Sequence, residues 1–256
     1  MRILKASVVS VIAIVVVVLA VLAYQHQTTF LQPATCLSDH CFCEEPRPTG
    51  LAQPVDAITS FAFVLLGAWG LFGRPKKATK EQKLIISFAA ILLFIGVSSF
   101  FYHSTLSFLG QFLDIFSMYL FGTLLILGAL IRRGQLTFKR AVLIFVIANI
   151  ILGLIQYSYP DARRVLFALI LLPGIALEFL PRTTGLRHGD KKMRFLYIGA
   201  GSLVVAYAFW LLDQANILCW GTSLFQGHGV WHVLTAVAAY MIILHYRQTP
   251  HAIKKP

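Results

Sequence analysis

The residue types best suited to chemistry in this chain are three histidines, a serine and an aspartate near the ends of apolar segments. Ser99 and His103 are four residues apart, about one helical turn, so both project from one face of a helix. Asp114 follows His103 by eleven residues, across a short uncharged connection. His228 and His232 form a second pair with the same spacing, at the start of the last apolar segment. Together the five residues offer imidazole, carboxylate and hydroxyl groups.

Three neutral imidazoles that leave a fourth position open to water are a known ligand set for catalytic zinc. Zinc lowers the pKa of the water molecule in that position to about 7, so hydroxide forms at neutral pH. A carboxylate close by can orient the water or take its proton, and a hydroxyl can donate a hydrogen bond to a developing oxyanion. The pattern therefore predicts a catalytic zinc site.

Each of these residues also has a structural interpretation. A histidine at a membrane boundary is commonly an amphipathic side chain with its polar tip in water. An aspartate at a helix end, such as Asp114, is commonly an N-terminal cap. A serine such as Ser99 commonly allows close packing of helices. We favour the zinc site because the histidines and the aspartate share one predicted depth.

The composition of the chain excludes an ordinary soluble fold. Of its 256 residues, 58% are hydrophobic and only 12% are charged, and the mean hydropathy is +0.76. A soluble domain carries about a quarter charged residues, and a disordered chain combines low hydrophobicity with high charge. A helix that crosses a bilayer needs about 20 mostly apolar residues. Segments of this kind occur at about 6–23, 57–73, 84–102, 115–131, 141–159, 165–180, 195–212 and 229–245.

These segments predict an all-α fold, an integral-membrane seven-helix bundle with an additional N-terminal hydrophobic helix, because spanning segments must satisfy their backbone internally. Residues 1–24 are a retained signal anchor, which the length of the apolar run favours, or a cleaved signal peptide. Residues 25–56 form an extracytoplasmic segment, 57–246 the transmembrane catalytic domain, and 247–256 a cytoplasmic tail. The short connections leave no room for a soluble domain.

The net charge of +12 indicates the orientation of the bundle. Positively charged loops stay in the cytoplasm. Of the 22 lysine and arginine residues, 19 lie before the first apolar segment, after the second, fourth and sixth, or after the last. Both termini are therefore predicted to be cytoplasmic if the first helix is retained, with the predicted zinc site near the extracytoplasmic side. The orientation of the helices in the bilayer explains the excess of basic residues, so no nucleic-acid partner is expected.

All four cysteines fall in segments that the charge pattern puts outside: Cys36, Cys41, Cys43 and Cys219. An oxidising compartment favours disulfides. We expect Cys43–Cys219 first and Cys36–Cys41 second, while the spacing itself leaves the connectivity open. A cysteine metal site is the weaker alternative, because Cys-x-Cys alone lacks zinc-finger spacing.

Three further ionisable residues receive structural interpretations. Glu178 is expected at the inner membrane interface, and His245 at the solvated cytoplasmic edge. Asp213 is expected to cap or brace the outer end of its apolar segment.

The arrangement of Ser99 and His103, then Asp114, then His228 and His232 resembles the alkaline ceramidase family. That family lies within a superfamily of seven-helix membrane hydrolases with PAQR-type and Per1-type proteins. Further similarity lies in Cys43-Glu44-Glu45, in Trp210-x-x-Asp213, and in Gly227-His228 before Trp231-His232, and it covers about residues 40–246.

The resemblance implies that His103, His228 and His232 bind zinc, that Asp114 is the general base and that Ser99 assists the oxyanion. The implied reaction is hydrolysis of the N-acyl bond of a ceramide-like membrane lipid to a fatty acid and a sphingoid base.

The resemblance also implies a calcium site before the first helix of the seven-helix pattern, built around a Cys-Glu-Glu stretch. Glu44 and Glu45 match this stretch, but Pro46 and Gln53 stand where further oxygen-rich ligands are expected, which argues against calcium.

Two other functions fit the same residues. One is ester hydrolysis or acyl transfer on the same zinc site, because ester and amide attack pass through similar oxyanions. The other is a receptor-like seven-helix protein with a structural zinc. A structural zinc is closed by four protein ligands, and the sequence offers three histidines without a strong fourth.

Overall fold

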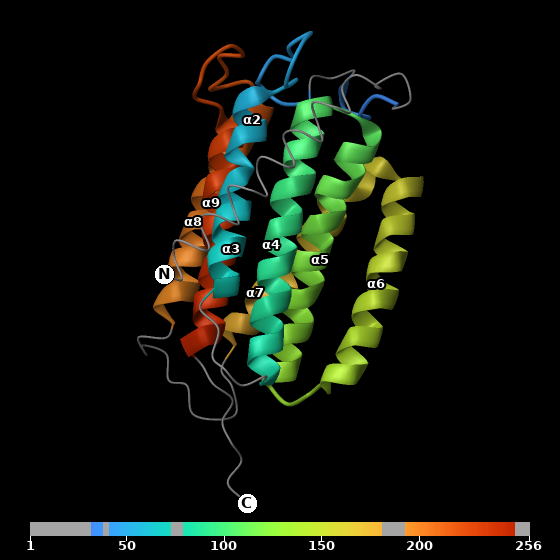
Figure 1. Ribbon diagram of the computed structural model, residues 1–256, viewed down its shortest axis with the longest axis vertical. Coiled ribbons are helices and arrows are strands. Elements are labelled where there is room, and N and C mark those ends of the chain that lie inside the picture. The colour runs from blue at the N-terminus through green and yellow to red at the C-terminus, as the bar shows by residue number, and fades with distance from the viewer. Residues whose placement is uncertain (1–31, 38–40, 73–78, 181–192, 249–256) are drawn as a thin grey trace, which may run out of the picture.

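The computed structural model describes residues 32–37, 41–72, 79–180 and 193–248 (Figure 1). Within these ranges the regular elements are helices, apart from one isolated antiparallel bridge between Pro33 and Ser107. The helices are α2 (Pro54–Thr59), α3 (Phe61–Phe72), α4 (Lys80–Thr105), α5 (Phe108–Arg132), α6 (Phe138–Ser158), η3 (Pro160–Ala162, a 3-10 turn), α7 (Arg163–Phe179), α8 (Arg194–Gln214) and α9 (Gly227–Gln248). The predicted all-α fold is confirmed, and the first apolar segment, 6–23, lies outside the described residues.

Most of these helices are long and apolar enough to cross a membrane. Six spans of the described residues meet this description: α2 with α3, then α4, α5, α6, α8 and α9. Only Ser60 separates α2 from α3, so the two form one nearly continuous span. Helix α7 is shorter, with 17 residues. The chain is therefore a multi-pass membrane protein, and each apolar segment predicted after residue 57 is helical.

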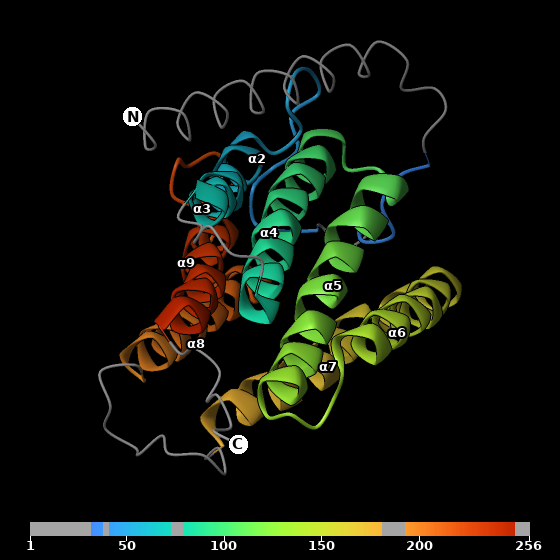
Figure 2. The ribbon, with the colours of Figure 1, turned by 60° about the horizontal axis from the view of Figure 1, so that its bottom comes forward.

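Helix α4 lies at the centre of the bundle. Helices α3, α5 and α9 pack against it, α8 packs on α9, and α6 and α7 pack on α5 (Figure 2). Large apolar side chains such as Phe88, Leu92, Leu125 and Ile243 fill the shared core. Helices α6 and α8 keep many large apolar side chains exposed, which suits helices that face lipid acyl chains.

Two glycines bring α3 and α4 into close contact. A Cβ atom on Gly67 would lie 2.9 Å from the carbonyl oxygen of Ala89, and one on Gly96 would lie 2.6 Å from Val64 Cγ2. Small residues matter between spanning helices because lipid tails remove the hydrophobic drive for association, so backbones must approach closely to gain packing energy. The contact at Gly96 holds the start of α3 against the half of α4 that carries Ser99.

Helix α5 begins earlier than the apolar pattern indicates. Ser107 is its N-cap and accepts a hydrogen bond from the backbone N–H of Gly110, just after a left-handed residue, Leu106 (φ 44°), ends α4. Asp114 therefore lies inside α5, in its second turn. The interpretation of Asp114 as an N-terminal cap is wrong.

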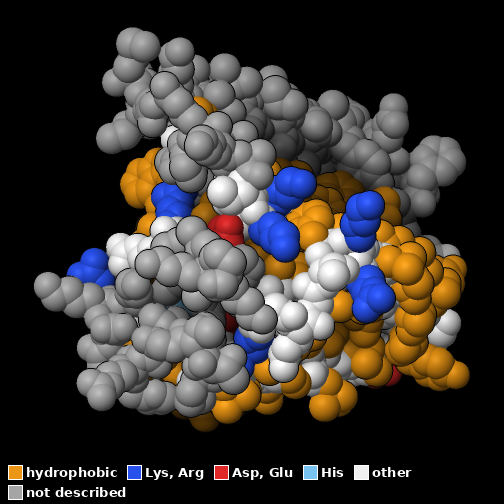
Figure 3. Space-filling view, turned by 90° about the horizontal axis from the view of Figure 1, so that it is seen from below, with side chains coloured by type: hydrophobic (Ala, Val, Ile, Leu, Met, Phe, Trp, Pro, Cys, Tyr) orange, Lys and Arg blue, Asp and Glu red, His pale blue; other side chains and the backbone are white. Residues whose placement is uncertain are grey.

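The opposite end of the bundle carries lysine and arginine side chains on its surface, as Figure 3 shows. A buried polar network lies within this end. Arg132 Nη1 donates to Glu178 Oε2 at 3.0 Å, and Tyr246 Oη donates to Glu178 Oε1 at 2.6 Å. His245 Nε2 lies 3.5 Å from Glu178 Oε2. The prediction that His245 is solvated is wrong, because ionisable groups in spanning helices turn inward and pair. Glu178, which the sequence placed at the inner membrane interface, lies in the last turn of α7 and is buried.

Two disulfides fasten the end of the bundle opposite this network. They join Cys36 to Cys41 and Cys43 to Cys219, the two pairs that the sequence placed first. The second bond links residues 176 positions apart, and it attaches the chain before α2 to the connection between α8 and α9. The segment before α2 is thereby fixed covalently next to the start of α9.

We expect the two disulfides to differ in how much they stabilise the fold. Loop-closure entropy predicts about 5 kcal/mol for the Cys43–Cys219 loop and about 2 kcal/mol for the Cys36–Cys41 loop. Thermal unfolding in detergent should therefore shift further for Cys43→Ser/Cys219→Ser than for Cys36→Ser/Cys41→Ser. Equal shifts in the midpoint temperature of the two double variants would contradict this expectation.

Candidate metal centre

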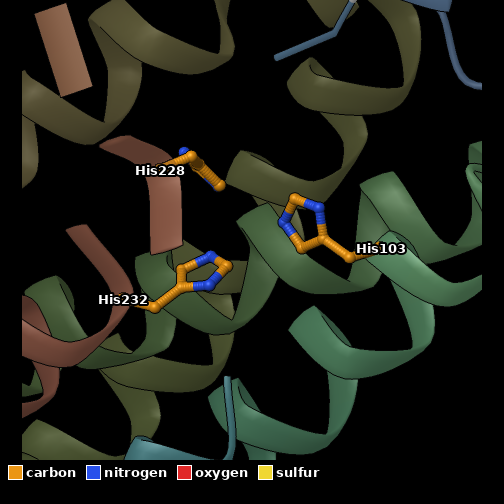
Figure 4. Close-up of side chains that lie close together, drawn as sticks. All are labelled: His103, His228 and His232. Carbon is orange, nitrogen blue, oxygen red and sulfur yellow. The ribbon is translucent and has the colours of Figure 1, made fainter. Parts of the chain in front are cut away.

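Three buried histidines converge where the C-terminal end of α4 meets the N-terminal end of α9 (Figure 4). His103 comes from α4, while His228 and His232 lie one turn apart on α9. One nitrogen atom of each ring belongs to a set whose members all lie within 4.8 Å of one another, and none of the three residues is more than 5% exposed. The arrangement could hold one metal ion.

The hydrogen bonds of these rings leave nitrogen atoms available to a metal. Gln53 Oε1 accepts from His103 Nδ1 at 2.9 Å, and the Asp56 carbonyl oxygen accepts from His232 Nδ1 at 3.0 Å. Among the described residues, His103 Nε2 and His228 Nδ1 are buried without a hydrogen-bond partner. Histidine ligands commonly donate their second ring N–H to an oxygen acceptor, which leaves the other nitrogen unprotonated. The residues present therefore fit a resident metal ion.

Ser99 connects this cluster to Asp114. Its hydroxyl oxygen lies 3.4 Å from His232 Nε2 and accepts a hydrogen bond from Ser60 Oγ at 3.0 Å. Ser99 also hydrogen bonds with the side chain of Asp114, which comes from α5. The Ser60 hydroxyl also donates to the Asp56 carbonyl oxygen at 2.9 Å, so Ser99, Ser60 and this carbonyl form one short polar chain beside His232. The five residues singled out in the sequence thus belong to one connected group.

Two residues around His228 were not predicted as parts of the site. The Phe42 ring stacks on the His228 ring, with centroids 3.7 Å apart. Asp213 Oδ1 accepts from the backbone N–H of His228, and its Oδ2 accepts from that of Cys43, both at 3.1 Å. Asp213 was expected to brace the outer end of α8. It also joins the start of α9 to the chain before α2.

Gln53 and Asp56 were missed for a different reason. Both lie at the start of α2, where a polar residue before proline and an acidic residue in the first turn are ordinary signals of a helix N-terminus. Their side chains are nevertheless fully buried, and Asp56 Oδ2 lies 4.0 Å from His103 Nδ1. No spacing rule connects residue 53 to residue 103, so only the fold reveals this contact.

The two glutamates considered for calcium have separate environments. The buried carboxylate of Glu44 accepts the backbone N–H groups of Val55 and Asp56 at 2.9 and 2.8 Å, in the first turn of α2. Burial raises the pKa of Glu44 above its usual value, and these two hydrogen bonds partly oppose the rise. Glu45 is exposed. Calcium takes six to eight oxygen ligands, and in the described ranges the two glutamates belong to no group of three metal-binding side chains.

Comparison with known proteins gives a consistent result. A family model described as Ceramidase matches residues 32–255. A putative alkaline ceramidase, dcd3B, of Dictyostelium discoideum is 24% identical over 227 residues, which cover 73% of this chain and 77% of that protein. The alkaline ceramidase of Drosophila melanogaster is 24% identical over 232 residues, covering 87% and 78%. Human alkaline ceramidase 1 is 24% identical over 197 residues, covering 73% and 72%.

Proposed function

The chain belongs to the ceramidase family, and we propose that it is a zinc-dependent integral-membrane amidase that hydrolyses the N-acyl bond of ceramide-like lipids. The products are a fatty acid and a sphingoid base. The observation that carries the proposal is the cluster of three buried imidazoles whose nitrogen atoms lie within 4.8 Å of one another. Cleavage of an amide needs a polarised carbonyl group and an activated water molecule. A metal ion held by this cluster would supply both.

The proposed metal ligands are His103, His228 and His232. Zinc is favoured over calcium because calcium takes oxygen ligands, whereas imidazole suits zinc. Zinc held by three imidazoles supplies a Lewis acid that activates a water molecule and polarises the amide carbonyl. The surrounding residues support this assignment, since oxygen acceptors already take the Nδ1 hydrogens of His103 and His232.

Asp114 is the proposed general base. Its carboxylate takes a proton from the attacking water and returns a proton to the amine nitrogen as the C–N bond breaks, so the fatty acid and the free amine leave with atoms balanced. Asp114 suits this role because it lies inside α5, is held by Ser99, and is not used as a helix cap.

Ser99 is the proposed oxyanion donor. Its oxygen is held by a hydrogen bond from Ser60 and lies 3.4 Å from His232 Nε2, which places the hydroxyl beside the proposed ligands. In this role the Ser99 hydroxyl turns its hydrogen toward the oxygen that gains charge when water attacks the carbonyl. Such a donor stabilises the transition state more than the substrate, which is what lowers the barrier.

The proposed orientation puts the metal centre near the extracytoplasmic side. The histidines lie at the end of the bundle opposite the basic surface of Figure 3, and basic residues mark the cytoplasmic side of a membrane protein. The substrate is a membrane lipid, so we infer that it reaches the centre from the bilayer in which the helices stand.

A comparison of matched lipids tests this function. The protein purified in detergent is given a ceramide and an O-acyl ester lipid with the same acyl chain, and the released fatty acid and free amine are measured with the zinc content. We expect amide cleavage with about one zinc per chain. Cleavage of the ester alone would replace the proposal with a lipid esterase. A zinc closed by four protein ligands, with no lipid cleaved, would support a receptor-like protein.

A further inference from the structure

Gln53 is a fully buried amide that bridges the proposed ligand His103 and the chain before α2. Its exposed fraction is 1%. Its Nε2 donates to the backbone carbonyl oxygen of Glu44 at 2.9 Å, and its Oε1 lies 2.9 Å from His103 Nδ1. Its own backbone N–H donates to the carbonyl oxygen of His103 at 2.8 Å. The same residue therefore holds both the backbone and the ring of His103.

These contacts fix the direction of the side-chain amide. The carbonyl oxygen of Glu44 can only accept, so the NH₂ group of Gln53 must face it, and the amide oxygen must face His103. An amide oxygen also only accepts, so the proton of the His103 ring is held on Nδ1. The unprotonated nitrogen is then Nε2, which is buried without a partner among the described residues. That nitrogen can bind a metal without first losing a proton.

The other end of the bridge is itself firmly held. The Glu44 carboxylate accepts two backbone N–H groups of the first turn of α2. Its neighbour Cys43 is bonded to Cys219 and donates its N–H to Asp213. Gln53 therefore connects a covalently anchored segment to the ring of His103 by two hydrogen bonds, which restrain the orientation of that ring.

From this geometry we propose that Gln53 is a positioning residue, which selects the tautomer and orientation of His103 and thereby sets the metal affinity of the centre. The inference rests on the proposed function, because it takes the three histidines as the metal ligands. It goes beyond that function by assigning a role to an uncharged residue that makes no contact with metal or substrate. Oxygen acceptors of this kind typically change metal affinity by 10–100-fold.

Three substitutions separate this role from simple packing. Gln53→Leu removes the acceptor while keeping a similar volume, and Gln53→Asn keeps an amide that is one methylene too short to span Glu44 and His103. Gln53→Glu keeps an acceptor for the His103 N–H. We expect zinc affinity, measured by competition with a chelator, to fall 10–100-fold for the first two variants and to stay within a few-fold of wild type for Gln53→Glu.

Gln156→Leu is the matched control, because Gln156 is also a buried glutamine, at 3% exposure, and donates to the backbone carbonyl of Phe112 in α5, a contact that involves none of the three histidines. We expect this variant to lose stability and to keep wild-type zinc affinity. The absorption spectrum of bound Co²⁺ gives a second readout, since a misplaced imidazole changes the ligand field. We expect a changed spectrum for Gln53→Leu and an unchanged one for Gln156→Leu.

The results distinguish the two proposals. If the wild-type protein binds zinc and Gln53→Leu and Gln53→Asn bind it equally well, the positioning role of Gln53 is wrong while the proposed function stands. If Gln53→Glu loses as much zinc affinity as Gln53→Leu, an acceptor for His103 is not what matters, and the inference is also overturned. If the wild-type protein binds no zinc, the proposed function itself fails.

Discussion

Replacing His228 by alanine is expected to remove bound zinc and to lower kcat/KM for a ceramide substrate by roughly 10³-fold or more, which is about 4 kcal/mol of transition-state stabilisation. The reason is that two imidazoles on different helices cannot hold the metal as three do. His228 is also buried, with the Phe42 ring stacked on its imidazole. Zinc content and the release of fatty acid from a ceramide measure the two effects.

His245→Ala is the matched control for this variant. His245 lies on the same helix, is equally buried, and belongs to the network of Arg132 and Glu178 at the opposite end. We expect His245→Ala to lower the unfolding temperature, because Glu178 loses a partner, while zinc content and kcat per folded molecule stay close to wild type. Unchanged turnover of His228→Ala would contradict the metal centre, whatever the control shows.

Asp114→Asn is expected to separate metal binding from catalysis. The amide has nearly the shape of the carboxylate and can still accept from Ser99, so the fold and the zinc content should stay close to wild type. The base is lost, and general-base catalysis typically contributes 10²–10⁴-fold. We therefore expect kcat to fall by about that factor, with a much smaller change in KM. Turnover of a ceramide at saturating concentration measures it.

Asp161→Asn provides the comparison for Asp114→Asn. Asp161 is an exposed aspartate at the same end of the bundle, in the turn before α7. The same chemical change there should leave kcat at its wild-type value. If Asp114→Asn lowers zinc content instead of kcat alone, Asp114 is a metal ligand rather than a base, and the catalytic assignment must be revised.

The helices and their common end could be predicted because they follow from local patterns. Apolar runs of sufficient length indicate spanning helices, and alternation of basic loops indicates which helix ends share a side. That placed Ser99, His103 and His228 at one end before any fold was known. That the cysteines form disulfides could be predicted in the same way, since all four fall on one predicted side, whereas the structure was needed to decide which cysteines pair.

The residues that position the histidines could not be predicted. Their contacts join positions far apart in the sequence, and several of these contacts involve main-chain atoms. Gln53 meets the ring of His103 and the carbonyl of Glu44, and Asp56 meets His232 by its main-chain oxygen, which carries no residue-specific signal. Asp114 was ambiguous because the apolar run starts several residues after the helix does. The pairing of Glu178 could not be predicted because its partners, Arg132 and Tyr246, come from other helices.

The covalent link between Cys43 and Cys219 also bears on how the protein is made. Two of the three histidines follow residue 227, so the ligand set is incomplete until α9 has been synthesised and has packed beside α4. The link that anchors the chain before α2 closes no earlier than the synthesis of Cys219. Under the proposed function the metal centre cannot be completed before α9 is in place, because a chain that ends before α9 lacks two of the three histidines.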